Sequence, residues 1–166
     1  MAVMEFRGAY DYLSNFYPSR IEFDGITYCS AEAAFQAQKC ADRKLREQFS
    51  GLTAVKARHR GRQVDMRPDW EQVKLGIMEQ IVRAKFAQHP ELAGRLMSTG
   101  DLQLVEGNAW HDVFWGVDLA TGKGENHLGR ILMMVRTELL AATLEDFVSC
   151  LRGQCVYALD AKKHRD

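Results

Sequence analysis

Apolar residues recur every three or four positions in two long stretches, and this spacing constrains the fold more than any other feature of the chain. Pro68 and Asp69 mark the start of the first stretch, which runs to about Gln88. The second begins at Asn126, which we expect to cap a helix. The recurring positions are Trp70, Val73, Ile77, Ile81 and Val82, then Leu128, Ile131, Leu132, Val135 and Leu139. Both stretches are predicted to be helices with one apolar face, so the core should be packed largely by helices.

Shorter elements are predicted around this pair of helices. Asp24-Gly25 suits the positive φ angles of a tight turn, so residues 20–28 are predicted to form a hairpin. Ser30 should cap a helix that runs to about Glu47, and Thr53 should cap a short one. The remaining predicted elements are a short helix over 90–98, a strand over 102–106, and a weaker helix with a polar tail over 143–166. The predicted fold class is therefore α+β, mostly helical, with a small antiparallel sheet.

The sequence contains no feature that divides it into two domains. Its 166 residues include three prolines, no internal repeat and no stretch typical of a linker. We therefore expect one domain over residues 1–141. Residues 142–166 should form a C-terminal helix and polar tail that packs on this domain or extends it.

Charge and cysteine content limit the classes of partner. Lys plus Arg equals Asp plus Glu at 22 each, so no overall field attracts nucleic acid or an acidic membrane. The N-terminal residues do not resemble a signal peptide, and no apolar run is long enough to cross a membrane. The four cysteines form no CxxC pair, so we expect free thiols, no metal site and a cytoplasmic protein.

Three polar residues in the helix predicted after Ser30 form the first candidate site. Glu32, Gln36 and Lys39 lie at i, i+4 and i+7, which places them in one stripe along the helix. Such a stripe either faces solvent or lines a cleft. In a cleft, Glu32 could act as a base, and a desolvated Lys39 would have a lowered pKa and could attack an anomeric carbon.

The segment 104–116 is the second candidate, because it carries two tryptophans and three polar side chains in a predicted loop. Trp110 and Trp115 could sandwich a base, while Glu106, Asn108 or Asp112 bind ribose hydroxyls or transfer protons. Alternatively, both indole rings anchor the loop to the core. The histidines at positions 111 and 127 are expected to be structural or exposed.

Two further features suggest binding of an anion. Residues 122–126, which include Gly124 and Asn126, precede the last predicted helix and could present backbone N–H groups to a phosphate. A plain flexible loop is the alternative, because the segment matches no established phosphate-binding pattern. In the basic run 56–62, Arg62 follows a glycine at a predicted turn and is the candidate phosphate contact.

The order of these motifs resembles the NADAR, or YbiA-like, family over residues 5 to about 141. The matching segments are Leu13-Ser-Asn-Phe16, Ala31-Glu-Ala-Ala-Phe-Gln-Ala-Gln-Lys39, Gly61-Arg62, Arg67-Pro-Asp-Trp70, Lys85-Phe86, Leu104-Val-Glu106, Trp110-His-Asp112, Trp115-Gly116 and Gly124-Glu-Asn-His-Leu-Gly129. Family members often read Ser-Glu-His in the first helix. This chain has Ala31-Glu32-Ala33, so no role of that histidine is carried over.

The resemblance implies an N-glycosidase that breaks a ribose C1′–N bond. Two substrate classes are implied: ribosylaminopyrimidine phosphates of the riboflavin pathway, and ADP-ribose attached to guanine in nucleic acid, with functional pairing to an ADP-ribosyltransferase toxin. It implies that Lys39 forms a Schiff base with the opened ribose, with acid–base help from Glu32 or Asp112. The alternative is a simple hydrolytic route in which Lys39 only binds phosphate or ribose. The resemblance adds Ser14, Asn15 and Phe16 as substrate-binding residues and implies no cofactor.

Two other functions are consistent with the same residues. A pocket without turnover would make a module that binds ADP-ribose or an NAD metabolite. A broad exposed apolar patch around Trp110 and Trp115 would instead favour an interface with a partner protein.

Overall fold

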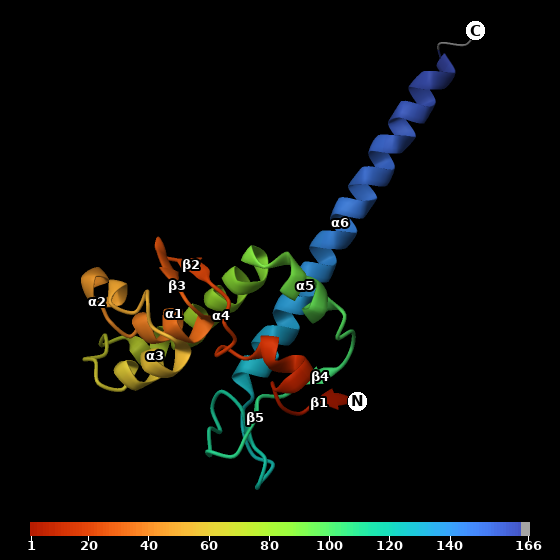
Figure 1. Ribbon diagram of the computed structural model, residues 1–166. Coiled ribbons are helices and arrows are strands. Elements are labelled where there is room, and N and C mark those ends of the chain that lie inside the picture. The colour runs from red at the N-terminus through yellow and green to blue at the C-terminus, as the bar shows by residue number, and fades with distance from the viewer. Residues whose placement is uncertain (164–166) are drawn as a thin grey trace.

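A computed structural model of the chain describes the backbone of residues 1–163 and the side chains of residues 1–152. Helices α4 and α6 pack against each other at the centre of the domain, and α5 packs against both (Figure 1). Their bounds are Trp70–Gln88 for α4, Pro90–Met97 for α5 and His127–Lys163 for α6. Ile81 and Val82 of α4 and Leu132 and Val135 of α6 are buried in the core. Each such side chain contributes about 1.5–3 kcal/mol when fully buried. The two long predicted helices are thus confirmed.

Helix α1, Ala31–Ala37, lies at the heart of the fold, and every one of its residues is buried. Its four alanines allow it to pack closely on α3 (Ala54–Gly61) and α4. The predicted caps at both N-termini are confirmed: Ser30 accepts a hydrogen bond from the backbone N–H of Ala33, and Thr53 accepts one from that of Lys56.

The prediction of one helix from Ser30 to about Glu47 is wrong, because the helix breaks after α1. A separate helix, α2, spans Arg43–Glu47 and begins at Asp42, whose side chain accepts from Lys44 N at 2.7 Å. The carbonyl of Lys39 accepts from Arg67 N at 2.7 Å and that of Cys40 accepts from Arg46 Nε at 2.8 Å. These two carbonyl groups therefore accept hydrogen bonds from residues other than those of a continuing helix, which allows the helix to end here.

Within the described residues, the strands form three two-stranded sheets, which together with the helices confirm the α+β class. The predicted hairpin is present: β2 (Ile21–Phe23) pairs antiparallel with β3 (Ile26–Tyr28), and Asp24 and Gly25 both have positive φ. The other two pairs are parallel and short. They join β1 (Ala2–Val3) to β4 (Gln103–Leu104) and β5 (Gly107–Asn108) to β6 (Val117–Asp118), and a 3-10 helix, η1, spans Gly8–Leu13.

The second half of α6 extends away from the domain (Figure 1). Residues 141–152 are all exposed, and the helix continues without interruption from the buried half that packs on α4. No helix in the described part of the chain has the length and hydropathy needed to cross a membrane.

Candidate active site

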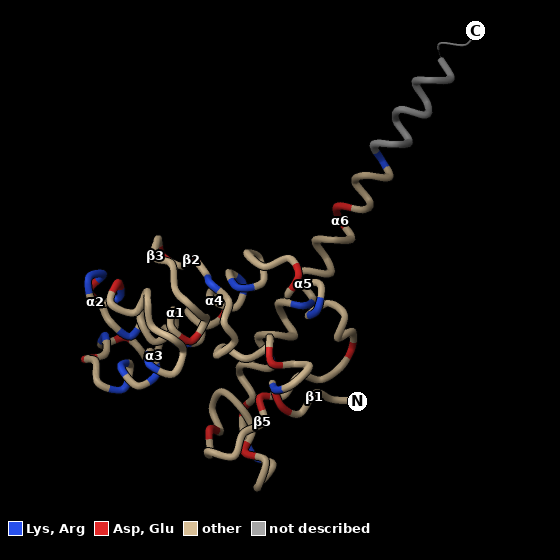
Figure 2. Tube along the Cα trace, viewed as in Figure 1, with Lys and Arg blue, Asp and Glu red and all other residues tan. Residues whose placement is uncertain are grey.

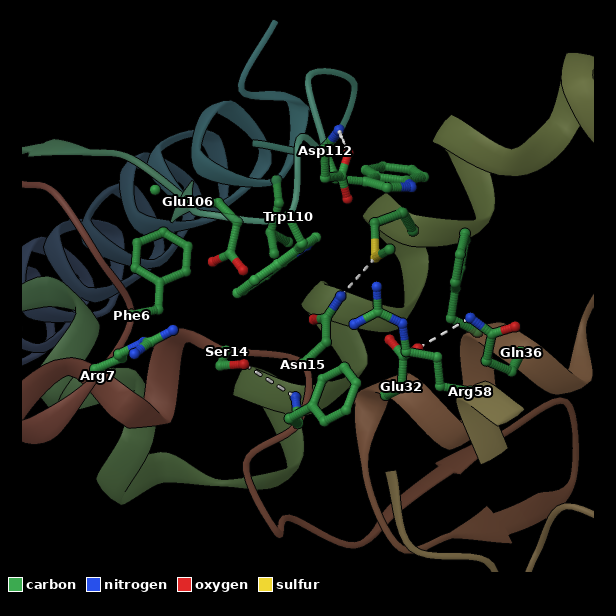
Figure 3. A pocket seen from close by; sticks show the side chains of 16 residues that line it. Phe6, Arg7, Ser14, Asn15, Glu32, Gln36, Arg58, Glu106, Trp110 and Asp112 are labelled. Atoms are coloured by element: carbon green, nitrogen blue, oxygen red, sulfur yellow. Dashed lines mark hydrogen bonds between the residues drawn. The ribbon is translucent and has the colours of Figure 1, made fainter. Parts of the chain in front are cut away.

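A pocket of about 280 Å³ lies where the N-terminal segment, α1, α3, α4 and the loop after β4 meet (Figure 3). Nine residues predicted from the sequence line it. They are Ser14, Asn15, Phe16, Glu32, Gln36, Glu106, Trp110, Asp112 and Trp115. The residue stripe on α1 and the tryptophan loop, which are more than 60 positions apart in the sequence, therefore face one shared cavity.

Glu106 carries the pocket's most perturbed carboxyl group. Burial, together with the nearby carboxylates of Asp112 and Glu32, raises its pKa to about 7 against the smaller opposing effect of Arg7 and Arg58. Its Oε2 atom is buried without a hydrogen-bond partner. Figure 3 shows the carboxyl group directed into the cavity between Phe6 and Trp110. Glu106 is thus protonated to a substantial degree near neutral pH and has an oxygen free to face a ligand.

Glu32 lies on the opposite side of the pocket, on α1, and is 7% exposed. Burial raises the pKa of its carboxyl group, while the hydrogen bond from Gln36 Nε2 to Glu32 Oε1, at 2.9 Å, and the charge of Arg58 lower it. Two of the three residues predicted as a polar stripe therefore line a cleft rather than facing solvent.

Asp112 is held in the pocket wall by its own loop. Its Oδ1 atom accepts from the backbone N–H groups of Phe114 and Trp115, at 3.2 and 2.9 Å. These bonds fix the carboxyl group relative to the backbone of Phe114 and Trp115.

Asn108 was predicted to bind substrate, but the structure buries it completely beneath the loop. Its Nδ2 donates to the carbonyls of Asp112 and Val117, and its Oδ1 accepts from the N–H groups of Trp110 and Asp112. All of its hydrogen-bonding capacity is therefore used by backbone, which makes Asn108 a positioning residue for the loop rather than a ligand contact.

Replacing Asn108 with alanine is expected to lower the free energy of unfolding by about 2–4 kcal/mol, because buried backbone groups lose their partners. Urea denaturation followed by circular dichroism measures this loss. The exposed Val113→Ala in the same loop serves as the control and should change stability by less than about 0.5 kcal/mol. Equal stability of the two variants would show that the Asn108 network does not hold the loop.

The two tryptophans differ in environment. Trp115 packs edge-on against Phe35 and Phe114, with centroid distances of 5.3 and 4.9 Å, and belongs to the periphery of the core. Trp110 is 47% exposed and still lines the pocket. Trp115 thus anchors the loop while forming part of the cavity wall, and Trp110 offers an indole face to a ligand at the opening.

Lys85 fixes the segment 14–16 that forms another wall. Its amine is almost completely buried and donates to the carbonyls of Tyr12 and Ser14, at 2.6 and 2.8 Å. Burial lowers its pKa to about 7. The backbone carbonyl of Asn15 in turn accepts from Glu32 N at 2.9 Å, which joins this wall to the start of α1. The Oδ1 atom of Asn15 is buried without a partner, so the wall also presents an unpaired acceptor.

Five predicted site residues, Asn108 among them, lie outside the pocket lining. The amine of Lys39 is half-buried and donates to the carbonyl of Gly61 at 3.1 Å. Burial lowers its pKa, and the charge of Glu32 opposes that effect. Arg62 is exposed at the end of α3. The remaining two are Gly124 and Asn126, which have structural roles in the backbone around them.

The glycine-rich segment before α6 is structural. Asn126 has positive φ and does not cap α6 with its side chain as predicted; instead its amide accepts from Glu106 N and donates to the carbonyl of Leu104. A Cβ at Gly124 would collide with the carbonyl of Gly116. Asn126 therefore positions Glu106, and Gly124 permits a close backbone approach beside β6.

The sequence reasoning missed several residues of the pocket. Arg58, from the same basic run as Arg62, lies beside Glu32 (Figure 3), and its guanidinium is 5.6 Å from the ring centre of Phe16. Arg7 adds a second cation. The apolar lining is completed by Phe6, Phe35, Met78 and Leu128, next to Gly107. The position of Arg58 one helical turn before Arg62, and that of Phe35 beside the polar stripe, are the signals from which these two could have been predicted.

No group of three His, Cys, Asp or Glu side chains in the described residues is placed to hold a metal ion. The site consists of three carboxyl groups, two guanidinium groups and an aromatic wall. Such a set can bind a sugar or a heterocycle, transfer a proton and stabilise positive charge.

The family model described as the NADAR domain matches residues 4–140. The N-glycosidase YbiA of Shigella boydii is 42% identical over 133 residues, which cover 78% of this chain and 82% of that protein. An N-glycosidase of Nostoc punctiforme is 37% identical over 136 residues, which cover 78% of this chain and 86% of that protein. A riboflavin biosynthesis protein of Vibrio vulnificus is 43% identical over 131 residues, 77% of this chain but only 35% of that longer protein.

The NMR structure of the Escherichia coli protein YbiA aligns with a TM-score of 0.75 and 38% sequence identity, covering 87% of this chain and 91% of that one. The fold and the site therefore define an enzyme of the N-glycosidase class, a hydrolase acting on N-glycosyl compounds. Within that class, the chain belongs to the NADAR family.

Proposed function

We propose that this enzyme hydrolyses the C1′–N bond between ribose and a base in a small phosphorylated nucleotide, with Glu106 as the general acid. The observation that carries the proposal is the buried Glu106 carboxyl group, whose pKa lies near 7 and whose Oε2 atom is unpartnered. It shares the cavity with the carboxyl groups of Glu32 and Asp112.

Each step of the reaction has a group in the pocket. Glu106 donates its proton to the leaving nitrogen as the C1′–N bond breaks, because an unprotonated base is a poor leaving group. The carboxylates of Glu32 and Asp112 stabilise the positive charge that develops at C1′. Water then adds to C1′, and the proton that it releases returns to the carboxyl cluster and restores Glu106.

Pocket size and charge favour a small substrate. Ligand pockets usually span roughly 300–1,000 Å³, and a cavity of about 280 Å³ fits one ribose–base unit. Arg7 and Arg58 can pair with a phosphate on that unit. The ribosylaminopyrimidine phosphates have this chemistry, and some relatives are named riboflavin biosynthesis proteins. ADP-ribosylated guanine is the second candidate, favoured by the exposed indole of Trp110, on which a group outside the cavity could stack.

The proposal is tested by incubating the protein separately with a ribosylaminopyrimidine phosphate and with ADP-ribosylated guanine nucleic acid. Mass spectrometry then follows the release of ribose phosphate or of ADP-ribose. We expect release from the first substrate. Release from the second alone would overturn the choice of substrate, and tight binding of ADP-ribose without any release would identify a binding module instead.

The role of Lys39 is tested by reductive trapping. The resemblance implies a Schiff base, for which a lysine of lowered pKa is suited, but its amine must first leave the carbonyl of Gly61. If the covalent route operates, turnover in the presence of borohydride leaves a ribose adduct on Lys39, and Lys39→Ala loses both the adduct and turnover. Absence of the adduct from an active enzyme would exclude the covalent route and leave direct hydrolysis by the carboxyl cluster.

A further inference from the structure

The half of α6 that extends beyond the domain carries a row of large apolar side chains in water. Leu140, Leu144, Phe147, Val148 and Leu151 are between 36% and 62% exposed. Their spacing of three and four residues places them on one side of the helix. The family model ends at residue 140, where this apolar row begins, so the fold and the active site do not account for it.

We propose that the apolar row of α6 is an interface on which a second copy of this chain pairs as an antiparallel helix. Leu140, Leu144, Phe147 and Leu151 follow the alternating four-three-four spacing of a coiled-coil seam. The row is continuous with the helix that packs in the core, so the domain holds its first residues in place.

Charges beside the apolar row favour an antiparallel pair of identical helices. A shallow groove along one edge is lined by Leu144, Glu145, Val148, Ser149 and Arg152. Glu145 and Arg152 are seven residues apart on this edge, with opposite charges. When two copies run in opposite directions and cross between residues 148 and 149, Glu145 of each lies level with Arg152 of the other. This arrangement forms two equivalent ion pairs. A parallel pair would instead place each residue beside the same residue of the other copy, so that like charges meet.

The shape of the molecule also favours the antiparallel arrangement. The domain lies at one end of the projecting helix (Figure 1), so antiparallel pairing places the two domains at opposite ends without collision. An anionic membrane surface is a poorer fit, because helices that bind one usually carry Lys and Arg on their polar face. Between residues 141 and 152 this helix carries two acidic residues, Glu145 and Asp146, and one basic residue, Arg152 (Figure 2).

The interface is tested by sedimentation equilibrium of the full chain over a wide concentration range. We expect a reversible dimer. Leu144→Asp should weaken association by about tenfold or more, because it places a charge in the seam. Ala142→Asp adds the same charge on the far side of the helix and should leave the dimer unchanged. A wild-type chain that remains monomeric, or equal effects of the two substitutions, would overturn the proposal.

Charge reversal tests the antiparallel register. Glu145→Arg alone and Arg152→Glu alone should each weaken the dimer by about threefold to tenfold. The double variant restores opposite charges across the pair and should regain the wild-type affinity. Failure of the double variant to recover would overturn the antiparallel pairing. Monomers that float with phosphatidylserine vesicles would overturn the proposed partner. Far-UV circular dichroism checks that each variant retains its helix.

Discussion

Replacing Glu106 with glutamine should lower kcat by about a hundredfold to ten-thousandfold, the usual contribution of a positioned general acid. Glutamine has nearly the same shape as glutamate, but it cannot release a proton. Steady-state kinetics on the ribosylaminopyrimidine phosphate measures the loss. The exposed Glu22→Gln should have wild-type kinetics and controls for the general loss of one charge.

Stability separates this catalytic loss from misfolding. Burial raises the pKa of Glu106 from its usual value to about 7, so the folded chain holds a proton that the unfolded chain has lost between about pH 4.5 and 7. Wild-type stability contributed by this group therefore falls as the pH rises through that range, and Glu106→Gln should not show this fall. We expect the variant to be inactive yet at least as stable as wild type at pH above about 7. An inactive variant with a strongly lowered Tm, or an active one, would contradict the assignment.

The same ionisation should shape the pH dependence of activity. Because the acid must be protonated, the rate should decline as the pH rises above about 7, where the carboxyl group of Glu106 loses its proton. A rate that stays constant well above that pH would show that the leaving base is protonated by another group.

Replacing Lys85 with methionine should have the largest effect on stability. Methionine fills similar space, but the carbonyls of Tyr12 and Ser14 lose their donor, at a cost of about 1–3 kcal/mol for each unsatisfied group. The wall formed by residues 14–16 should loosen, which should also raise KM. The exposed Lys56→Met is the matched control and should change neither stability nor KM.

The stability deficit of Lys85→Met should depend on pH. Burial lowers the pKa of this lysine to about 7, so above that pH the folded chain holds fewer protons than the unfolded chain. Wild-type stability from this group therefore rises between about pH 7 and 10, and the deficit of the variant should grow over the same range. Urea unfolding near both limits measures it. A deficit that is the same at both pH values would show that Lys85 stays fully charged in the core.

Features set by neighbouring residues in the sequence were predictable. The hairpin depends on Asp24-Gly25, the cap of α3 on Thr53, and the extent of α4 on its apolar spacing, and the structure confirms all three. The break after α1 was not predictable from helical preference. It depends on Asp42 starting a new helix and on Arg67, which is distant in sequence and binds the carbonyl of Lys39.

The same break in the helix explains why only part of the candidate site was predicted correctly. Glu32 and Gln36 lie on α1 and line the pocket, but the helix ends at Ala37 before the stripe reaches Lys39. Asn108 and Asn126 are polar residues in segments predicted as loops, which is typical of ligand contacts, yet both are used to pair backbone groups. Tertiary packing decides between these roles, and the spacing of residues in the sequence does not predict that packing.

The central claim is that the carboxyl cluster cleaves the C1′–N bond of a ribosyl base. The most direct test is hydrolysis in water enriched in a heavy oxygen isotope, followed by mass spectrometry of both products. We expect the heavy atom in the hydroxyl or carbonyl oxygen at C1 of the released sugar phosphate, an unlabelled free base, and no products with Glu106→Gln. Label in the base, or undiminished release by Glu106→Gln, would contradict the mechanism.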